Sequence, residues 1–233
     1  MNIGLLLSGG TGTRLGGEIP KQYIEVSGRP VIAWSLERLF RHEEIEAVQI
    51  AADPMWQEAV RRWIPAEHLE KKFMGFSLPG ENRQLSILHG LEDIRRYAAD
   101  TDYVLVHDAA RPMLTEALIS ACLKAVTGYD GVLPALPMKD TVYASLDGMA
   151  ISSLLNRKEL FAGQAPEIFQ LGKYYEANIM LPPDKLLQIN GASEPAVLAG
   201  MDIRLIPGDE GNFKITTQTD LARFQEIAGR YRK

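Results

Sequence analysis

The hydrophobic pattern of the chain alternates between two periods. Four short apolar runs have the length and composition of buried β-strands, and they lie at 2–8, 46–52, 103–107 and 131–136. Between these runs, apolar positions recur every three or four residues, as on one face of an α-helix. Helices are expected at 31–41, 55–64, 84–98 and 115–127, with a weaker segment at 69–78. This alternation predicts a mostly parallel sheet covered by helices on both faces, in three α/β/α layers. Its ligand site is expected at the carboxyl ends of the strands.

The second half of the chain is less regular. Residues 137–170 mix short β-like runs with a helix expected at 157–161, and we interpret this segment as a β-arm that leaves the main sheet. The remaining elements are a helix near 171–179, a loop through Pro182-Pro183, a strand at 202–206 and a helix at 218–231. Since no repeat or linker interrupts the pattern, we interpret residues 1–233 as one domain.

Composition narrows the classes of function. The 25 basic and 30 acidic residues give a net charge of −5, which argues against a protein that binds nucleic acid or an anionic membrane surface. No apolar stretch approaches the ~20 residues that span a bilayer, and the first residues lack the basic region of a signal peptide. The single cysteine, Cys122, is interpreted as a buried hydrophobe and not as a reactive thiol. We therefore expect a cytoplasmic protein.

A glycine-rich segment, LSGGTGTRLGGEIPKQY at 7–23, follows the first strand directly. Its first glycines let backbone N–H groups approach a ligand and form an anion-binding nest; they are Gly9, Gly10 and Gly12. Arg14 can bind phosphate oxygens in a bidentate manner, and Lys21 supplies a mobile point charge. Backbone donors and paired cations together favour phosphate binding over a tight turn with two solvated cations.

Two common nucleotide-binding motifs do not fit this segment. Walker A requires GxxxxGK[ST], which is absent, and the dinucleotide fingerprint requires a third glycine where Leu15 stands before Gly16. A nicotinamide-dependent oxidoreductase therefore suits the alternation of elements but not the motif.

The same segment resembles the N-terminal motif of the 2-C-methyl-D-erythritol 4-phosphate cytidylyltransferases and of the related ribitol-5-phosphate cytidylyltransferases. Four further segments agree in order and spacing; they are PGENRQLSILHGL at 79–91, VLVHDAARP at 104–112, PMKDT at 137–141 and GNFKITTQTDL at 211–221. The resemblance covers nearly the whole chain and implies a nucleotide-diphospho-sugar transferase-like fold. It also implies a homodimer paired through the arm within 137–170, and a Mg²⁺-dependent transfer from CTP to a polyol phosphate with release of pyrophosphate.

The resemblance further implies a role for each matching residue. The CTP would be wrapped by Ser8, Gly9, Gly10 and Gly12, and its phosphates would meet Arg14 and Lys21. Its cytosine end would be held at Gly80, Arg83 and Ser86, and its ribose near Asp108 and Ala109, with Asp108 also binding the metal. The polyol phosphate would be bound by Arg111, Thr141, Arg157 and Asn190. Lys214 would act beside the reacting phosphate, as a catalytic cation together with Arg14 and Lys21.

Several of these residues also have a purely structural interpretation. Asp108 ends an apolar strand, where an aspartate suits a Mg²⁺ or ribose contact but also a turn. Arg83 and Ser86 begin a helix, and on their own they are better explained as its N-terminus. Lys214 equally suits an exposed strand end. We interpret His107 as structural, and as packing residues the three tryptophans Trp34, Trp56 and Trp63.

Three positions at the acceptor end depart from the family pattern. The usual Thr-Pro-Gln is Ala165-Pro166-Glu167 here, and a usual aspartate is Asn190. Asn190 keeps an acceptor but loses the charge, and Glu167 is expected to add negative charge near the substrate. Buried polar groups discriminate strongly between hydroxyl patterns, so the acceptor stays open. Methylerythritol phosphate is the family default, ribitol 5-phosphate or another polyol phosphate is the alternative, and a non-catalytic nucleotide-binding protein is a third interpretation.

Overall fold

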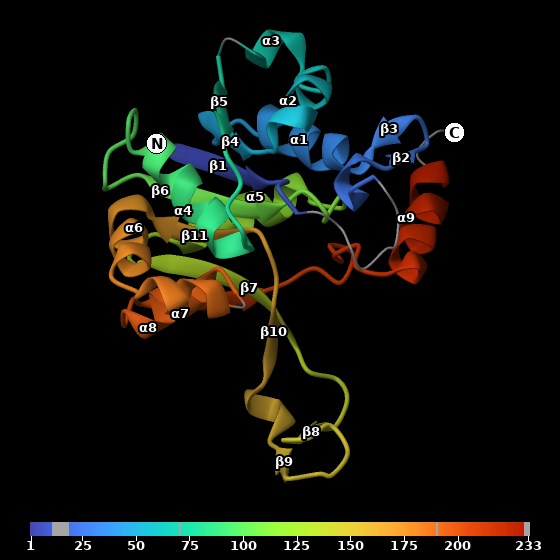
Figure 1. Ribbon diagram of the computed structural model, residues 1–233, viewed down its shortest axis with the longest axis vertical. Coiled ribbons are helices and arrows are strands. Elements are labelled where there is room, and N and C mark those ends of the chain that lie inside the picture. The colour runs from blue at the N-terminus through green and yellow to red at the C-terminus, as the bar shows by residue number, and fades with distance from the viewer. Residues whose placement is uncertain (11–18, 70, 190, 231–233) are drawn as a thin grey trace.

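The computed structural model describes residues 1–10, 19–69, 71–189 and 191–230, which form a central sheet of eight strands (Figure 1). The strands follow the order β10-β7-β11-β6-β1-β4-β5, and β12 pairs with β7. Their bounds are β1 (Asn2–Leu7), β4 (Ala47–Ala51), β5 (Phe73–Ser77), β6 (Tyr103–Asp108), β7 (Gly131–Pro137), β10 (Phe161–Gly163), β11 (Glu167–Gln170) and β12 (Ile203–Pro207).

The sheet is mostly parallel, as the alternation of elements predicted. Strand β1 pairs in parallel with β4 on one side and with β6 on the other, and β5 and β12 are also parallel to their partners. Strand β11 differs, because it runs antiparallel between β6 and β7. The sequence assigned its residues to the arm, whereas the structure inserts them into the middle of the sheet, where their apolar side chains are buried.

Helices cover both faces of the sheet, so the predicted three layers are confirmed (Figure 1). On one face, α1 and α5 pack through Leu36 and Ile119 against strand residues such as Leu6. On the other, α4 and α6 pack through Leu91 and Tyr174. The helices are α1 (Val31–Arg41), α2 (Pro54–Arg61), α3 (Ala66–Leu69), α4 (Arg83–Ile94), α5 (Glu116–Ala125), α6 (Leu171–Ile179), α7 (Pro183–Gln188), α8 (Ser193–Leu198) and α9 (Gln218–Arg230).

Three local expectations were wrong in detail. The weak segment at 69–78 divides into the end of α3 and strand β5, and the helix expected at 157–161 is a short 3-10 turn, η3 (Arg157–Glu159). The loop expected at Pro182-Pro183 is the start of α7. Proline at the first helical position has no N–H that the helix would need, and its φ is already helical, so it starts α7 instead of preventing it.

The arm leaves the sheet between β7 and β10 and carries a small hairpin of β8 (Val142–Ala144) and β9 (Ser153–Leu155) (Figure 1). Within the arm, seven large apolar side chains are exposed: Tyr143, Leu146, Met149, Ile151, Leu154, Leu155 and Phe161. Helix α9 packs on the short strand β2 (Glu25–Val26), which pairs with β3 (Arg29–Pro30). None of the helices in the described ranges combines the length and apolar character needed to cross a bilayer.

Candidate active site

Asp108 is the last residue of β6, at the carboxyl end of the parallel strands. It lies in register with Leu7, the last residue of β1. The residues that follow β1, Ser8 to Gly10, therefore begin beside Asp108, and we call them the glycine turn. The Ala109 N–H donates to the Leu7 carbonyl at 2.9 Å, which fixes the chain after Asp108 against this turn. The site predicted at the carboxyl edge therefore brings a carboxylate and the glycine turn together.

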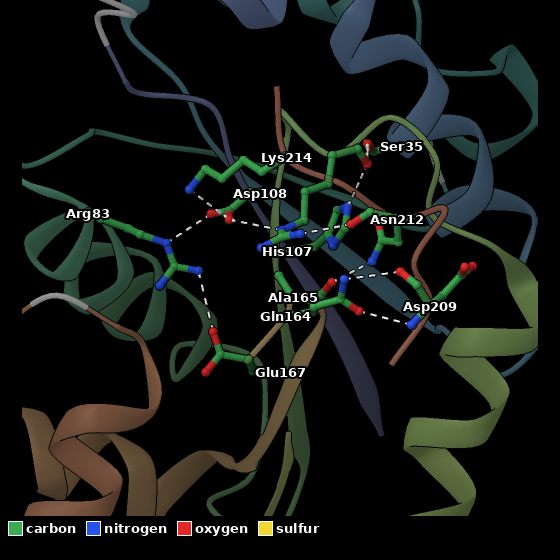
Figure 2. Close-up of polar contacts among 11 residues, drawn as sticks. Ser35, Arg83, His107, Asp108, Gln164, Ala165, Glu167, Asp209, Asn212 and Lys214 are labelled. Atoms are coloured by element: carbon green, nitrogen blue, oxygen red, sulfur yellow. Dashed lines mark hydrogen bonds and ion pairs between the residues drawn. The ribbon is translucent and has the colours of Figure 1, made fainter. Parts of the chain in front are cut away.

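Arg83, the first residue of α4, binds two carboxylates. Its Nε lies 2.9 Å from Oδ1 of Asp108, and a terminal nitrogen lies 3.6 Å from Oε1 of Glu167 (Figure 2). The first turn of α4 is held by Asn82, whose side chain accepts from the Leu85 N–H at 2.8 Å. Arg83 is therefore neither a solvated helix-start arginine nor free to point elsewhere, because β6 and β11 hold it from two sides.

Two further cations lie close to the second carboxylate oxygen of Asp108. Lys214 Nζ lies 3.0 Å from Oδ2 of Asp108, and Arg111 Nε lies 3.7 Å from the same oxygen (Figure 2). Backbone contacts set both positions. The Ile215 N–H donates to the Ala110 carbonyl at 2.8 Å, and Arg111 donates to the Asn212 carbonyl at 2.8 Å. Lys214 is consequently part of the cluster and not an exposed strand-end lysine.

The charges of this cluster determine which of its groups stay ionised. Burial by itself raises the pKa of Asp108, but Arg83, Lys214 and Arg111 outweigh it and hold that pKa well below the usual range. Burial raises the pKa of Glu167, and Arg83 offsets this effect only in part. Asp108 is thus a stable anion surrounded by cations, and the described cluster combines three positive with two negative side chains.

The glycine turn is packed at one position and open at the next. A Cβ at Gly9 would lie 2.2 Å from Cβ of Pro79, so a larger residue does not fit there, whereas a Cβ at Gly10 would meet nothing within 4 Å. Ser8 is buried, and its Oγ donates to the Ala51 carbonyl at 2.9 Å. Gly9 therefore maintains the packing of the turn, while Gly10 leaves room for a ligand.

The loop before α4 is the segment expected at the cytosine. A Cβ at Gly80 would lie 2.2 Å from Cβ of Leu85, which only glycine avoids. The Gly80 N–H donates to the Ser86 Oγ at 3.0 Å, and this hydroxyl donates to the Asn82 carbonyl at 2.9 Å. The hydroxyl of Ser86 is thus used to shape the loop, and a base bound here would meet a turn that α4 has already ordered.

The remaining expected site residues do not join the cluster. Thr141 is exposed at the base of the arm, and Arg157 lies in η3 within the arm, where it donates to the Lys139 carbonyl at 2.8 Å. Lys21 opens the 3-10 turn η2 (Lys21–Tyr23) and is half-buried. Three expected residues lie outside the described residues: Gly12, Arg14 and Asn190.

The structural interpretations of His107, Trp34, Trp56 and Cys122 are confirmed, whereas Trp63 is 36% exposed and is not a buried packing residue. His107 is fully buried, its Nε2 lies 3.1 Å from the Arg111 carbonyl, and burial lowers its pKa to about 4. Trp34 packs edge-on against Phe224, and Trp56 stacks on Tyr23. Cys122 is buried, and burial raises the pKa of its thiol to about 12. None of these groups is equipped for chemistry at the site.

Sequence reasoning missed several supporting residues. Glu167 was expected to add negative charge near the substrate, but its ion pair with Arg83 was not foreseen. Asn212 is buried and donates to the Ala165 carbonyl at 2.7 Å, and Gln164 exchanges two hydrogen bonds with the backbone of Asp209 (Figure 2). Gln22 is buried beneath the glycine turn. Gln22 and Asn212 stand inside motifs quoted above, so polar residues within a motif were the signal available for these two, whereas Gln164 lies outside them.

The fit to a divalent cation depends on one carboxylate. Within the described ranges, no group of three His, Cys, Asp or Glu side chains gathers to hold a metal. Mg²⁺, however, is commonly held by one or two carboxylates and by the phosphates of its substrate, with water completing the shell. Asp108 fits a metal that arrives with a triphosphate. To bind it, one carboxylate oxygen of Asp108 would exchange its contact with Arg83 or Lys214 for the metal.

Comparison with known proteins identifies relatives that are cytidylyltransferases. The family model for 2-C-methyl-D-erythritol 4-phosphate cytidylyltransferase matches residues 3–230. The chain is 34% identical over 229 residues to such an enzyme from Rubrobacter xylanophilus, covering 97% of this chain and 94% of the relative. It is 30% identical over 232 residues to a ribitol-5-phosphate cytidylyltransferase from Streptococcus agalactiae, covering 97% and 95%. A crystal structure of 2-C-methyl-D-erythritol 4-phosphate cytidylyltransferase from Thermus thermophilus superposes with a TM-score of 0.72 at 25% identity, covering 96% and 97%.

Proposed function

Because the chain belongs to the 2-C-methyl-D-erythritol 4-phosphate cytidylyltransferase family, we propose that it transfers the cytidylyl group of CTP to 2-C-methyl-D-erythritol 4-phosphate. The observation that carries this proposal is the cluster of Arg83, Arg111 and Lys214 around Asp108, beside the glycine turn. A cationic site next to a phosphate-binding turn suits the meeting of two phosphorylated substrates.

The chemistry requires charge neutralisation more than proton transfer. An oxygen of the acceptor phosphate attacks the α-phosphorus of CTP and forms a new P–O bond. The bond from that phosphorus to the bridging oxygen breaks, and pyrophosphate leaves with the electron pair. The nucleophile is already anionic near neutral pH, so positioning and electrostatic stabilisation supply most of the rate. This agrees with a site rich in cations, in which His107 is buried, neutral and bound to the backbone.

The residues divide between the two substrates. We propose that the turn at Ser8–Gly12, with Arg14 and Lys21, binds the triphosphate, and that the Gly80 loop receives the cytosine. Lys214 and Arg111 lie on one side of Asp108 and would neutralise the acceptor phosphate. Asp108 would hold the Mg²⁺, which neutralises phosphate charge when it is bound. The lone Cys122 is buried and suits a reducing cytoplasm.

The arm supports a homodimer. Its exposed apolar side chains form a surface of the kind that usually marks a protein interface. Thr141 and Arg157 match acceptor-binding positions, yet both are exposed on the arm, beyond the edge of the sheet that carries the cluster (Figure 1). We propose that two arms pair and that each arm brings these two residues to the site of the other subunit.

A second acceptor is favoured by specific observations. Ribitol-5-phosphate cytidylyltransferases are 30% identical to the chain over nearly its whole length. In addition, Ala165 and Glu167 replace the Thr and Gln that are usual at the acceptor end. The test is kcat/KM for each polyol phosphate at saturating CTP and Mg²⁺. At least ~10-fold higher kcat/KM with methylerythritol phosphate would support the first acceptor, and the reverse ranking would assign ribitol 5-phosphate. Turnover with neither, while CTP still binds, would contradict both.

A further inference from the structure

Gln22 lies beneath the glycine turn and contacts it twice. Its side chain is buried, and its Nε2 donates to the Ser8 carbonyl at 2.6 Å and to the Gly10 carbonyl at 2.6 Å. A glutamine amide carries two N–H donors, so both donors are used on carbonyls of the same turn. Gln22 belongs to η2 and comes 12 residues after Gly10 in the sequence. Its amide thus joins the beginning of the glycine-rich segment to its end.

Tyr23 reinforces one of these contacts. Its hydroxyl lies 3.0 Å from the Ser8 carbonyl and 3.1 Å from the Ser8 Oγ, and its ring stacks on Trp56 at a centroid distance of 4.4 Å. Ser8 itself is bound to β4, since its N–H donates to the Ala51 carbonyl at 2.8 Å. The start of the turn is therefore fixed from the sheet and from η2 together.

The contact with Ser8 determines where one N–H of the turn points. In a planar trans peptide the C=O and N–H bonds point to opposite sides. With the Ser8 carbonyl turned toward Gln22, the N–H of Gly9 points away from Gln22. Among the residues that the structure describes, no acceptor lies on the Gly9 N–H. An anion above the turn would find this donor already oriented, without rearrangement of the backbone.

We propose that Gln22 is a positioning residue for nucleotide binding, which holds two carbonyls inward so that the turn presents its N–H groups to the triphosphate. This inference rests on the proposed function, because it assumes that CTP occupies the glycine turn. It assigns Gln22 no contact with the substrate. Its effect is on the orientation of the backbone, and so on the affinity for CTP more than on the chemical step.

The test replaces the amide with side chains of similar length. Gln22→Met removes both donors, and Gln22→Glu replaces them with a carboxylate that repels the two carbonyls. A matched control is Gln49→Met, because Gln49 is equally buried but donates to the Ser77 hydroxyl on β5 and to no carbonyl of the turn. Both Gln22 variants are expected to raise KM for CTP about tenfold or more, with a smaller change in kcat. The rise in melting temperature that CTP produces in the wild type should shrink in parallel. Gln49→Met should keep the CTP-induced rise in melting temperature of the wild type, even where it lowers the melting temperature without ligand.

The outcomes separate this inference from the proposed function. If the wild type binds CTP and both Gln22 variants bind it equally well, the role of Gln22 is overturned while the function stands. If Gln49→Met loses CTP affinity to the same extent, the effect is general destabilisation and the inference is also overturned. If the wild type itself does not bind CTP, the proposed function fails, and this inference fails with it.

Discussion

Nε of Arg83 lies 2.9 Å from Oδ1 of Asp108, and this ion pair joins the first turn of α4 to the carboxyl end of β6. Lys214 approaches the other oxygen of Asp108 at 3.0 Å. The carboxylate is thereby held from two sides by groups that are distant in the sequence. A negatively charged side chain is tolerated among phosphate-binding residues here because its charge is neutralised by cations that the fold supplies.

Replacing Asp108 by asparagine tests whether its charge serves the reaction. Asp108→Asn keeps the shape but leaves the surrounding cations without their shared anion, and it removes the carboxylate proposed to hold Mg²⁺. We expect kcat/KM to fall at least ~100-fold, measured as pyrophosphate release over a range of Mg²⁺ concentrations. Asp130→Asn is the control, since Asp130 is also ion-paired, to Lys173, but lies before β7 and away from the cluster. Equal losses in the two variants would count against a role for Asp108 in the reaction.

Glu167 provides a prediction about stability and pH. Burial raises the pKa of this carboxyl, so the folded chain binds its proton more tightly than the unfolded chain does. Such a group destabilises the fold once the pH exceeds both pKa values, and the effect disappears below the unfolded value. Glu167→Gln should therefore raise the melting temperature at about pH 8, and raise it by less near about pH 4.

Glu210→Gln is the matched control for this measurement. Glu210 is exposed, and its hydrogen bond with Lys139 lowers its pKa, so its replacement should give no gain in melting temperature at either pH. A Glu167→Gln variant that is less stable than the wild type at about pH 8 would show that the ion pair with Arg83 outweighs the burial of the charge.

The sequence predicted the strands and helices that have a clear period, and it predicted where the site would lie. It could not predict β11, because four residues with a charged first position become a central strand only when β6 and β7 pair with them. For the same reason the sequence did not reveal the ion pair of Glu167. Its partner, Arg83, comes from a helix that begins 84 residues earlier in the chain, and no local pattern records that contact.

The site residues show the same division. Asp108 and Lys214 were found because they stand in specific motifs, and the structure brings them together. Thr141 and Arg157 were expected at the acceptor phosphate but lie on the arm, outside the described cluster, because no local pattern records where the arm extends. Gln22 was overlooked because an uncharged amide beside Lys21 does not stand out until its buried contacts are known.

Two neighbouring glycines allow packing and ligand approach to be separated. A side chain at Gly9 would overlap Pro79, so Gly9→Ala should lower stability by about 1–3 kcal/mol. A Cβ at Gly10 would meet no atom of the described residues within 4 Å, so Gly10→Ala should leave the melting temperature near that of the wild type, while it weakens CTP binding by obstructing the turn. Thermal melting with and without CTP measures both effects. Unchanged CTP affinity in Gly10→Ala would contradict close approach of the nucleotide to this glycine.

The apolar surface of the arm predicts the oligomeric state. Leu146 and Met149 are 97% and 89% exposed in the single chain, and burying them against a second arm would stabilise a dimer. The double variant Leu146→Asp, Met149→Asp should shift the mass in sedimentation equilibrium from dimer to monomer, and should also reduce activity if Arg157 acts across the interface. Met180→Asp, on an equally exposed methionine outside the arm, should leave the mass unchanged. A wild-type protein that sediments as a monomer would rule out pairing through the arm.

The most direct test of the proposed site compares acceptor-dependent pyrophosphate release from CTP by the wild type and by Lys214→Met. Lys214→Met leaves Arg83 and Arg111 to neutralise the buried Asp108, so thermal melting of the variant is measured alongside to establish that it is folded. We expect the wild type to release pyrophosphate only when CTP and a polyol phosphate are both present. We expect Lys214→Met to lower kcat at least ~100-fold. A Lys214→Met enzyme that releases pyrophosphate at the wild-type rate would contradict the assignment of this cluster as the site of cytidylyl transfer.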